Sequence, residues 1–386
     1  MYNFDKKIER AGTASVKYDM REEIFGKADV LPMWVADMDF ETPECIRKAV
    51  LERASHPIYG YSIMTDAYFE AFIGWVNRRH NWKIQKEWMV FSPGIVTAIN
   101  AAVLSFTNPN DGVIIQPPVY FPFFDSVKNN GRKQLANQLL YLDNTYKIDF
   151  DDLTKKAKEA KLMLLSSPHN PVTRCWSEEE LKRIGKICLE NDVVILSDEI
   201  HADLTLPGYK HIPLASLSPE LAEVTITCMA PSKTFNVAGL FTSQIVIKNK
   251  KLREKFKKTM DTFQLIHGNI FGMVASEAGY RHGDAWLDAL KAYLLGNFNL
   301  VDQFLKSELP QLTLVKPEAT FLAWIDYSKT GITDKIMQKK LVEEASLGLN
   351  PGRMFGPGGN GFMRMNLGTP RGTVLEGLER MKHIRF

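Results

Sequence analysis

The sequence predicts an α/β protein in which a mainly parallel central sheet lies between layers of helices and is followed by a smaller α+β domain. Between about residues 94 and 247, helical segments alternate with short apolar runs that contain few polar residues, which is typical of strands buried on both faces. The runs are Val113–Ile115, Leu162–Leu165, Val193–Leu196, Val224–Thr227 and Gln244–Ile247. Alternation of this kind favours parallel strands joined by covering helices.

The 386 residues exceed the size of one core, since domains of about 150 residues are common. Residues 1–44 contain several turn signals and are interpreted as an N-terminal arm that joins the small domain. Residues 45–284 form the predicted large domain, and residues 285–386 form the small C-terminal domain. Helices are expected at Glu44–Ser55, Ala67–Arg79 and across much of 251–307, and small-domain strands at Thr313–Val315, Phe321–Ile325 and Gly361–Asn366.

Composition and charge favour an ordinary globular protein that acts on small molecules. The net charge of +3 gives no reason to expect nucleic acid or an anionic membrane as a partner, and the lysines of 248–258 are interpreted as a solvated helix face. The charged N-terminus does not resemble a secretory signal, and no run approaches the roughly 18 apolar residues of a membrane span. Because the cysteines have no C-x-x-C pair, we expect free thiols, a cytoplasmic location and no metal site.

Polar residues follow the predicted strands where a ligand site is expected. In open α/β sheets, ligands bind beyond the carboxyl ends of the strands. The four loops in question are Gln116–Tyr120, Ser166–Pro171, Ser197–His201 and Met229–Lys233.

Two of these loops contain the reactive groups that pyridoxal 5′-phosphate (PLP) requires. PLP chemistry needs a lysine for the aldehyde and an acid beside the pyridine nitrogen. Lys233 follows a buried strand, where desolvation lowers the pKa of an amine, although a surface lysine is the commoner explanation for one such residue. Asp198 follows another strand, but strand-end carboxylates also bind metals or ribose and cap helices.

The remaining groups complete a PLP site. Asn170 is a candidate partner for the ring hydroxyl or a turn residue before proline, and Tyr120 is a candidate stacking partner or a core residue. Candidate phosphate donors are Ser232 and the amides of residues 92–97, among them Ile95 and Val96. Residues 94–97 lead into a predicted helix, and the start of a helix binds anions.

Arg364 lies on a short alternating strand. Its guanidinium suits a substrate carboxylate, and a structural ion pair is the alternative.

Taken together and in this order, these residues resemble the fold-type I PLP enzymes of the aminotransferase class I/II superfamily over nearly the whole chain. The shared marks are His169–Pro171, Asp198, Ser232–Lys233 and Arg364–Asn366, and Asp198 precedes Lys233 by 35 residues (233 − 198). A narrower resemblance is to the MalY/PatB branch, the cystathionine β-lyase-like C–S lyases. Its marks are Met33–Phe40, Tyr59–Tyr61, Pro118–Tyr120, Ser197–Asp203 and Ser232–Gly239, and many aminotransferases have tyrosine where His201 stands.

The resemblance implies a role for each site residue. Lys233 is expected to hold PLP as a Schiff base, Asp198 to pair with the pyridinium, and Tyr120 to stack on the ring. Asn170 and His201 are expected near the ring hydroxyl. The implied phosphate and cofactor contacts further include Ser232, Ile95, Val96 and Tyr61, and the implied substrate-binding residues are Arg364, Ala36, Asn170 and Tyr61.

Tyr61 is expected to reach the phosphate of the neighbouring subunit, so the resemblance also implies a homodimer with shared active sites. One departure from the family pattern is Thr173, which stands where glycine is usual. Threonine adopts positive φ poorly, so the sequence predicts local reshaping of this loop near Cys175 and Trp176.

The activity implied is α,β-elimination of cystathionine or a related cysteine thioether to a thiol, pyruvate and ammonia, a reaction of amino-acid metabolism and methionine biosynthesis. Lys233 removes the Cα proton and can return a proton to the leaving sulfur. An aminotransferase on the same scaffold and a regulatory protein that retains PLP stay open as alternatives. A nicotinamide enzyme is disfavoured, because the G-x-G-x-x-G at Gly356–Gly361 precedes an alternating strand and is better interpreted as a turn before Arg364.

Overall fold

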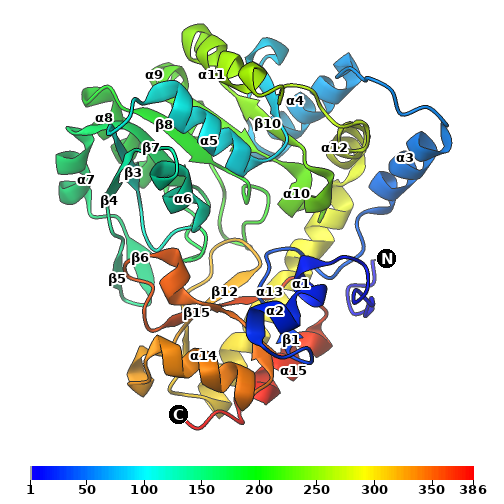
Figure 1. The fold of residues 1–386 in the computed structure, drawn as a ribbon, viewed down its shortest axis with the longest axis vertical. Coiled ribbons are helices and arrows are strands. Elements are labelled where there is room, and N and C mark those ends of the chain that lie inside the picture. Colours follow the sequence, from blue (N-terminus) through cyan, green and yellow to red (C-terminus); the bar gives the residue numbers. More distant parts are fainter. Residues whose placement is uncertain (1) are drawn as a thin grey trace.

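The computed structural model describes residues 2–386, and in this range the larger sheet has seven strands in the order β2-β10-β9-β8-β7-β3-β4 (Figure 1). Strands β4, β3, β7, β8 and β9 run parallel, and β10 is antiparallel to both of its neighbours. The strands are β2 (Met89–Ser92), β3 (Gly112–Ile115), β4 (Lys133–Ala136), β7 (Ala160–Ser166), β8 (Val194–Asp198), β9 (Thr225–Met229) and β10 (Ser243–Val246). The predicted fold class, with a mainly parallel central sheet, is therefore confirmed.

Successive residues of each central strand pack on opposite faces of this sheet. Val113 and Leu162 contact one layer of helices, whereas Ile114 and Met163 contact the other. The first layer contains α5 (Ile95–Phe106), α6 (Pro122–Lys128) and α11 (Lys250–Thr262). The second contains α7 (Phe150–Ala157), α8 (Glu178–Glu190) and α9 (Pro219–Val224). Burial on both faces explains why these strands lack polar alternation.

A third group of helices packs at the β2 end of the sheet. It comprises α3 (Glu44–Ser55), α4 (Asp66–His80) and α12 (Ile270–His282), which share a core with the first half of α13 (Asp284–Glu308). Helix α3 has the predicted bounds, and α4 is one residue longer at each end than predicted.

The second large sheet is antiparallel, in the order β11-β12-β15-β14. Its strands are β11 (Thr313–Leu314), β12 (Leu322–Asp326), β14 (Asn350–Pro351) and β15 (Phe362–Asn366), and it packs with α14 (Asp334–Glu343) and α15 (Arg371–Met381). In the N-terminal arm, β1 (Leu31–Pro32) pairs with β13 (Leu347–Gly348) beside this sheet. The domain boundaries themselves stay predictions.

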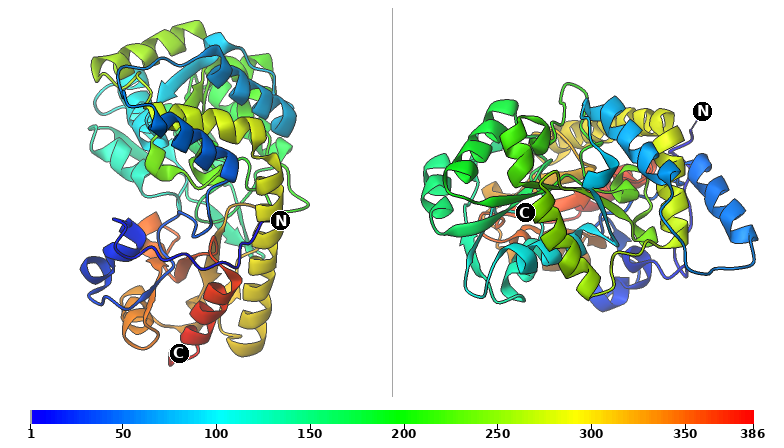
Figure 2. Two further views of the ribbon diagram at one scale, coloured as in Figure 1. Left: turned by 90° about the vertical axis from the view of Figure 1, so that its right-hand side faces the viewer. Right: turned by 90° about the horizontal axis from the view of Figure 1, so that it is seen from above.

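Helix α13 runs along the molecule from one sheet to the other (Figure 2). Leu287 and Leu290 pack in the core of α3 and α4, whereas Phe298 and Val301 pack under the antiparallel sheet.

Among residues 2–386, none of the helices combines the length and the apolar character needed to cross a membrane. The shorter elements are α1 (Val16–Asp19), α2 (Arg21–Phe25), α10 (Pro231–Thr234), β5 (Leu140–Leu142) and β6 (Thr145–Lys147).

The carboxyl ends of the central strands meet at one level. Ser166 pairs with Asp198, and Asp198 pairs with Cys228, so the loops after β7, β8 and β9 leave the sheet side by side. Helix α10 begins at Pro231, two residues after β9, and carries Lys233 on its only turn. The sheet thereby brings three of the four predicted loops together.

The glycines of 356–361 form a tight turn that leads into β15. A short 3-10 segment, Gly352–Phe355, precedes them, and the strand that carries Arg364 follows. A Cβ atom on Gly359 would lie 2.1 Å from the carbonyl oxygen of Gly352. The glycines therefore permit a close backbone approach, and the interpretation of this motif as a turn is confirmed.

Replacing Gly359 by alanine should destabilise the fold, because the new methyl group meets backbone that has to move. We expect Gly359→Ala to lower the free energy of unfolding by about 1–3 kcal/mol, measured by urea denaturation. Gly372→Ala on α15 is the matched control, since nothing lies within 4 Å of its Cβ position, and it should be neutral or slightly stabilising. Equal stabilities for the two variants would contradict this account of the turn.

Candidate active site

Lys233 lies on α10, just beyond the end of β9, and is partly buried, with its amine turned towards the N-terminal arm. Its Nζ donates a hydrogen bond of 2.5 Å to the carbonyl oxygen of Ala36. Burial lowers the pKa of Lys233 to about 8; the nearby positive charge of Arg364 acts in the same direction, and Asp37 and Asp198 oppose it. Part of the Lys233 population is therefore the neutral, nucleophilic amine near physiological pH.

Asp198 is the last residue of β8 and is buried. Burial raises the pKa of its carboxyl to about 7, and the neighbouring charge of Glu199 adds to the effect. The backbone N–H of Ile200 donates to Oδ1 at 3.2 Å and favours the charged form, as does Lys233. A cation placed against this carboxylate, such as a protonated pyridine nitrogen, would bring the raised pKa of Asp198 down and favour its charged form.

Arg364 is a buried cation whose partners are all neutral oxygens. Its guanidinium donates to Asn170 Oδ1 at 3.0 Å, to Asn350 Oδ1 at 2.7 Å and to the carbonyl of Trp34 at 3.0 Å. Its Nε has no hydrogen-bond partner, and burial lowers the pKa of Arg364 to about 10. A carboxylate ligand would supply both the missing acceptor and the missing negative charge.

His201 and Tyr120 complete the polar wall of the cavity. Burial, together with the positive charges of Lys233 and Arg364, lowers the pKa of His201 to about 3, so the ring is neutral at physiological pH. Its Nδ1 is buried without a partner. Burial raises the pKa of Tyr120, so its hydroxyl stays protonated.

The start of α5 supplies donors for an anion. Gly94 occupies the N-cap position without a side-chain cap, so the first amides of the helix, from Ile95 to Thr97, keep free N–H groups. Gly94, Ile95, Val96 and Ser232 line one cavity of about 290 Å³. The same cavity is lined by Ala36, Tyr120, Asn170, Asp198, His201 and Lys233. The donors, the acid, the lysine and the unpartnered buried atoms fit PLP.

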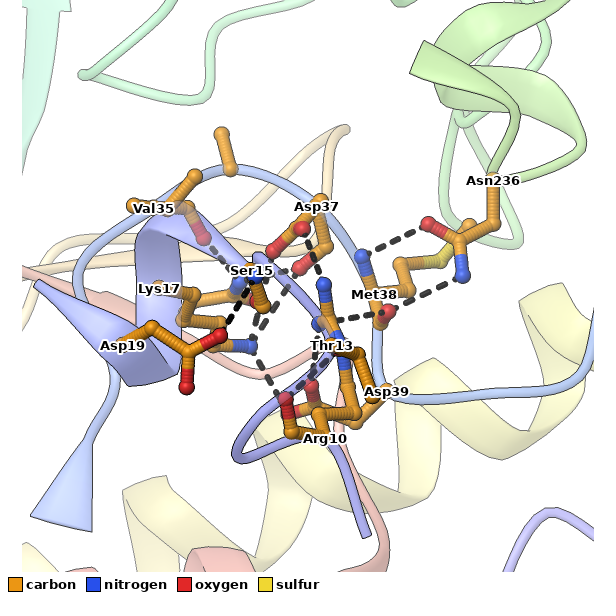
Figure 3. Close-up of polar contacts among 12 residues, drawn as sticks. Arg10, Thr13, Ser15, Lys17, Asp19, Val35, Asp37, Met38, Asp39 and Asn236 are labelled. Carbon is orange, nitrogen blue, oxygen red and sulfur yellow. Dashed lines mark hydrogen bonds and ion pairs between the residues drawn. The ribbon is translucent and has the colours of Figure 1, made fainter. Parts of the chain in front are cut away.

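Two asparagines that the sequence did not single out hold residues 33–40 against this cavity. The Asn366 amide donates to the carbonyls of Val35 and Asp37 at 2.5 and 2.7 Å. The side-chain oxygen of Asn236 accepts a hydrogen bond from the Met38 N–H at 2.9 Å, and its amide nitrogen donates to the Met38 carbonyl at 2.9 Å (Figure 3). The motifs Ser232–Gly239 and Arg364–Asn366 contain both residues, so position in the motif was the available signal.

Sequence reasoning also missed the buried network behind Lys233. Asp203 accepts hydrogen bonds from the Thr234 hydroxyl at 2.7 Å, His80 Nε2 at 2.8 Å and Trp75 Nε1 at 3.1 Å. These contacts tie α10 to α4. Within Ser197–Asp203, Asp198 and His201 face the cavity, whereas Asp203 points away from it.

Two predictions on the periphery of the site have different outcomes. Tyr61 is fully exposed and lies outside the cavity of its own chain, so its predicted contact with a neighbouring subunit stays a prediction. The predicted reshaping at Thr173 is wrong, because the threonine itself adopts φ +63°. Its N–H donates to His169 O at 2.8 Å and its hydroxyl donates to Lys316 O at 3.3 Å, and these bonds offset a strain of about 1–2 kcal/mol.

The lowered pKa of Lys233 predicts how cofactor capture depends on pH. In protein stripped of PLP, the rate at which added PLP develops visible absorbance should rise with pH through a midpoint near 8, because only the neutral amine attacks the aldehyde. Lys233→Ala should show no such absorbance at any pH. A midpoint near the ordinary value of 10.5 would contradict the inferred desolvation.

Comparison with known proteins identifies the family of the chain. Residues 28–381 match the family model "Aminotransferase class I and II". The chain is 47% identical to cystathionine beta-lyase PatB of Bacillus subtilis over 382 residues, 98% of this chain and 99% of the relative. It is 30% identical to Protein MalY of Escherichia coli, with 98% and 97% covered.

Solved structures match equally far along the chain. The PLP-containing structure of cystalysin from Treponema denticola is 38% identical with a TM-score of 0.96, over 99% of this chain and 98% of that one. A PLP-bound putative aminotransferase from Clostridium difficile is 42% identical with a TM-score of 0.98 over 100% of both chains. The fold, the lysine site and these matches together show that the chain belongs to the aminotransferase class I and II family.

Proposed function

We propose that this protein is a PLP-dependent C–S β-lyase that cleaves cystathionine or a related cysteine thioether to a thiol, pyruvate and ammonia. The observation that carries the proposal is one cavity lined by the amine of Lys233 and the acid Asp198, whose wall residue Asn170 accepts a hydrogen bond from the buried cation Arg364. Near-full-length relatives named cystathionine beta-lyase, cystalysin and C–S lyase support this chemistry. The free thiols of all four cysteines suit a reducing cytoplasm.

Arg364 and Asn170 are placed to bind the carboxylate of the amino acid. The guanidinium already donates to Asn170 Oδ1, so the carboxylate would meet two side chains whose relative positions are fixed. When bound, PLP supplies an electron sink for charge that develops at Cα. Asp198, which lines the same cavity, would keep that sink effective by holding a negative charge against the pyridine nitrogen.

Lys233 is the group that moves protons. Its amine, with a pKa of about 8, accepts the proton from Cα as the Cβ–S bond breaks. The resulting ammonium can donate a proton to the departing sulfur, which leaves as a thiol. The remaining enamine takes up water and releases ammonia and pyruvate.

An aminotransferase is the second candidate, because the family and the Clostridium difficile structure both carry that name. The same lysine serves both reactions, so the assay has to separate them. The lyase needs no second substrate, whereas the transferase needs a keto acid such as 2-oxoglutarate.

Purified protein with PLP should release pyruvate and thiol from cystathionine without any keto acid. Lys233→Ala should lower turnover at least about 10³-fold, because the proton carrier is lost. Lys251→Ala, which removes an exposed lysine of α11, is the matched control and should keep wild-type activity. Formation of glutamate from 2-oxoglutarate, without release of pyruvate or thiol, would replace the lyase with the aminotransferase.

We further propose that the protein is a homodimer with shared active sites. The chain from α3 to α4 exposes an apolar group that a monomer has no reason to keep in water. Its members are Leu51, Ile58, Tyr59, Tyr61 and Ile63. Val96 and Phe241, at the edge of the cofactor cavity, are exposed as well. A partner that covers both groups would place its Tyr61 near the cavity.

Complementation between two damaged subunits tests this arrangement. Light scattering should give twice the 43.9 kDa of one chain. Tyr61→Ala alone should lose about tenfold or more in activity, since one phosphate donor is removed. Co-expressed Lys233→Ala and Tyr61→Ala chains should then recover about a quarter of wild-type activity, because half of the randomly paired dimers contain one intact site out of two.

The control pairs Lys233→Ala with Asp198→Asn. Both of these residues belong to the site of their own chain, so no activity should return. Failure of the Tyr61 pair to exceed the mean of its two parents would contradict a shared site.

A further inference from the structure

A second cavity, of about 780 Å³, adjoins the cofactor cavity on the side of the N-terminal arm. The two cavities share four wall residues: Ala36, Lys233, Ala238 and Phe241. A volume of this size lies within the range of small-molecule sites. Because Lys233 borders both spaces, a group that leaves the substrate beside this amine has direct access to the second cavity.

A cluster of four charges lies at this cavity, and three of them, Arg10, Asp37 and Asp39, line its wall (Figure 3). The inner pair is Lys17 and Asp39, which are 1% and 5% exposed and 2.7 Å apart. The outer pair is Arg10 and Asp37, which are 21% and 23% exposed and 2.6 Å apart. Arg10 also donates to Asp39 at 2.7 Å, so the inner pair holds the outer pair in place.

The outer pair presents both signs of charge to the cavity. Arg10 and Asp37 both line it, whereas Lys17 does not. Arg10 uses three N–H donors, on Asp37, Asp39 and the Met38 carbonyl, which leaves two of its five N–H groups for another acceptor. A fixed pair of a guanidinium and a carboxylate is complementary to a zwitterion that lies antiparallel to it.

Asp37 also lies close in the chain to the reacting centre. It follows Ala36, whose carbonyl accepts the Lys233 hydrogen bond at 2.5 Å. The sulfur of a β-thioether is bonded to the carbon next to Cα, and a second amino-acid group lies only a few bonds beyond that sulfur. A substrate whose carboxylate is bound by Arg364 can therefore extend its far end past Lys233 towards Arg10 and Asp37.

We propose that Arg10 and Asp37 form a subsite for the distal amino-acid group of the substrate, Asp37 binding its ammonium and Arg10 its carboxylate. This inference rests on the proposed lyase function and narrows its substrate class. The preferred substrates are sulfur compounds with an amino acid at both ends, such as cystathionine, lanthionine or cystine. Thioethers with a neutral S-substituent leave the pair unused.

A purely structural role for the same pair makes a different prediction. Arg10 and Asp37 also fix residues 33–40, which carry the carbonyls that bind Lys233 and Arg364. If Arg10 and Asp37 have only this structural role, their substitution lowers kcat/KM to the same degree for every substrate. The two roles are separated by how strongly the loss depends on the S-substituent.

The experiment measures kcat/KM of the PLP-loaded enzyme for four substrates. They are cystathionine, S-(2-aminoethyl)-L-cysteine with a distal cation, S-(2-carboxyethyl)-L-cysteine with a distal anion, and the neutral S-propyl-L-cysteine. Asp37→Asn should lose about tenfold more on the aminoethyl substrate than on the propyl substrate. Arg10→Gln should show the same excess loss on the carboxyethyl substrate, and both variants should show it on cystathionine.

Asp19→Asn is the control, with the same change of charge in the same arm. Asp19 accepts the N–H groups of Gly12 and Ser15 and does not line the cavity, so any loss should be uniform across the four substrates. If Asp37→Asn fails to fold, Asp37→Glu keeps the charge but displaces it, and the same excess loss on the aminoethyl substrate is expected.

Equal losses on all four substrates in the Asp37 and Arg10 variants would overturn the subsite and leave the structural role. A wild-type enzyme that cleaves none of the four would instead reject the lyase function on which the subsite rests.

Discussion

The arrangement of the site depends on one irregular segment with several bends, residues 33–40, whose backbone carbonyls accept hydrogen bonds from Lys233 and Arg364. Lys233 comes from the end of the parallel sheet and Arg364 from the antiparallel sheet, and each donates to a carbonyl of this segment. Asn236 and Asn366 pin the segment from the same two sides. Because main-chain carbonyls cannot move independently of one another, the separation of the two cations is set by the backbone itself.

The second constraint is charge that the fold buries without full compensation. Arg364 contacts only neutral oxygens, and Lys233 and Asp198 have pKa values displaced towards their neutral forms. Such groups are costly in a protein without ligands, since a buried charge that has lost water needs a partner. A ligand with a carboxylate, a phosphate and a protonated ring nitrogen supplies charge where this fold lacks it. The buried charges that destabilise the protein without a ligand therefore make it selective for ligands that carry the complementary charges.

Much of this architecture follows from local pattern. Apolar runs predicted five of the central strands to within a few residues, because burial on both faces leaves an unmistakable composition. The runs missed the two edge strands, β4, whose first residues are exposed, and β2, which is buried. The motifs around Lys233 and Asp198 indicated the site. The ion pairs of Arg10 and the network of Asp203 did not emerge, because they join residues far apart in sequence, and pairing of that kind leaves no periodic signal.

Helix α13 has a mechanical consequence. Its 25 residues extend about 38 Å at 1.5 Å per residue, and its two ends are embedded in different hydrophobic cores. Between the parts of α13 that lie in the two cores, Asn297 donates hydrogen bonds to the carbonyls of Leu367 and Thr369. These bonds hold the helix against the chain just beyond β15. Any rotation of one sheet relative to the other must therefore twist or bend this continuous helix, because no flexible loop connects the two sheets at this point. A rigid helical connection of this kind favours small displacements of the two sheets over wide opening.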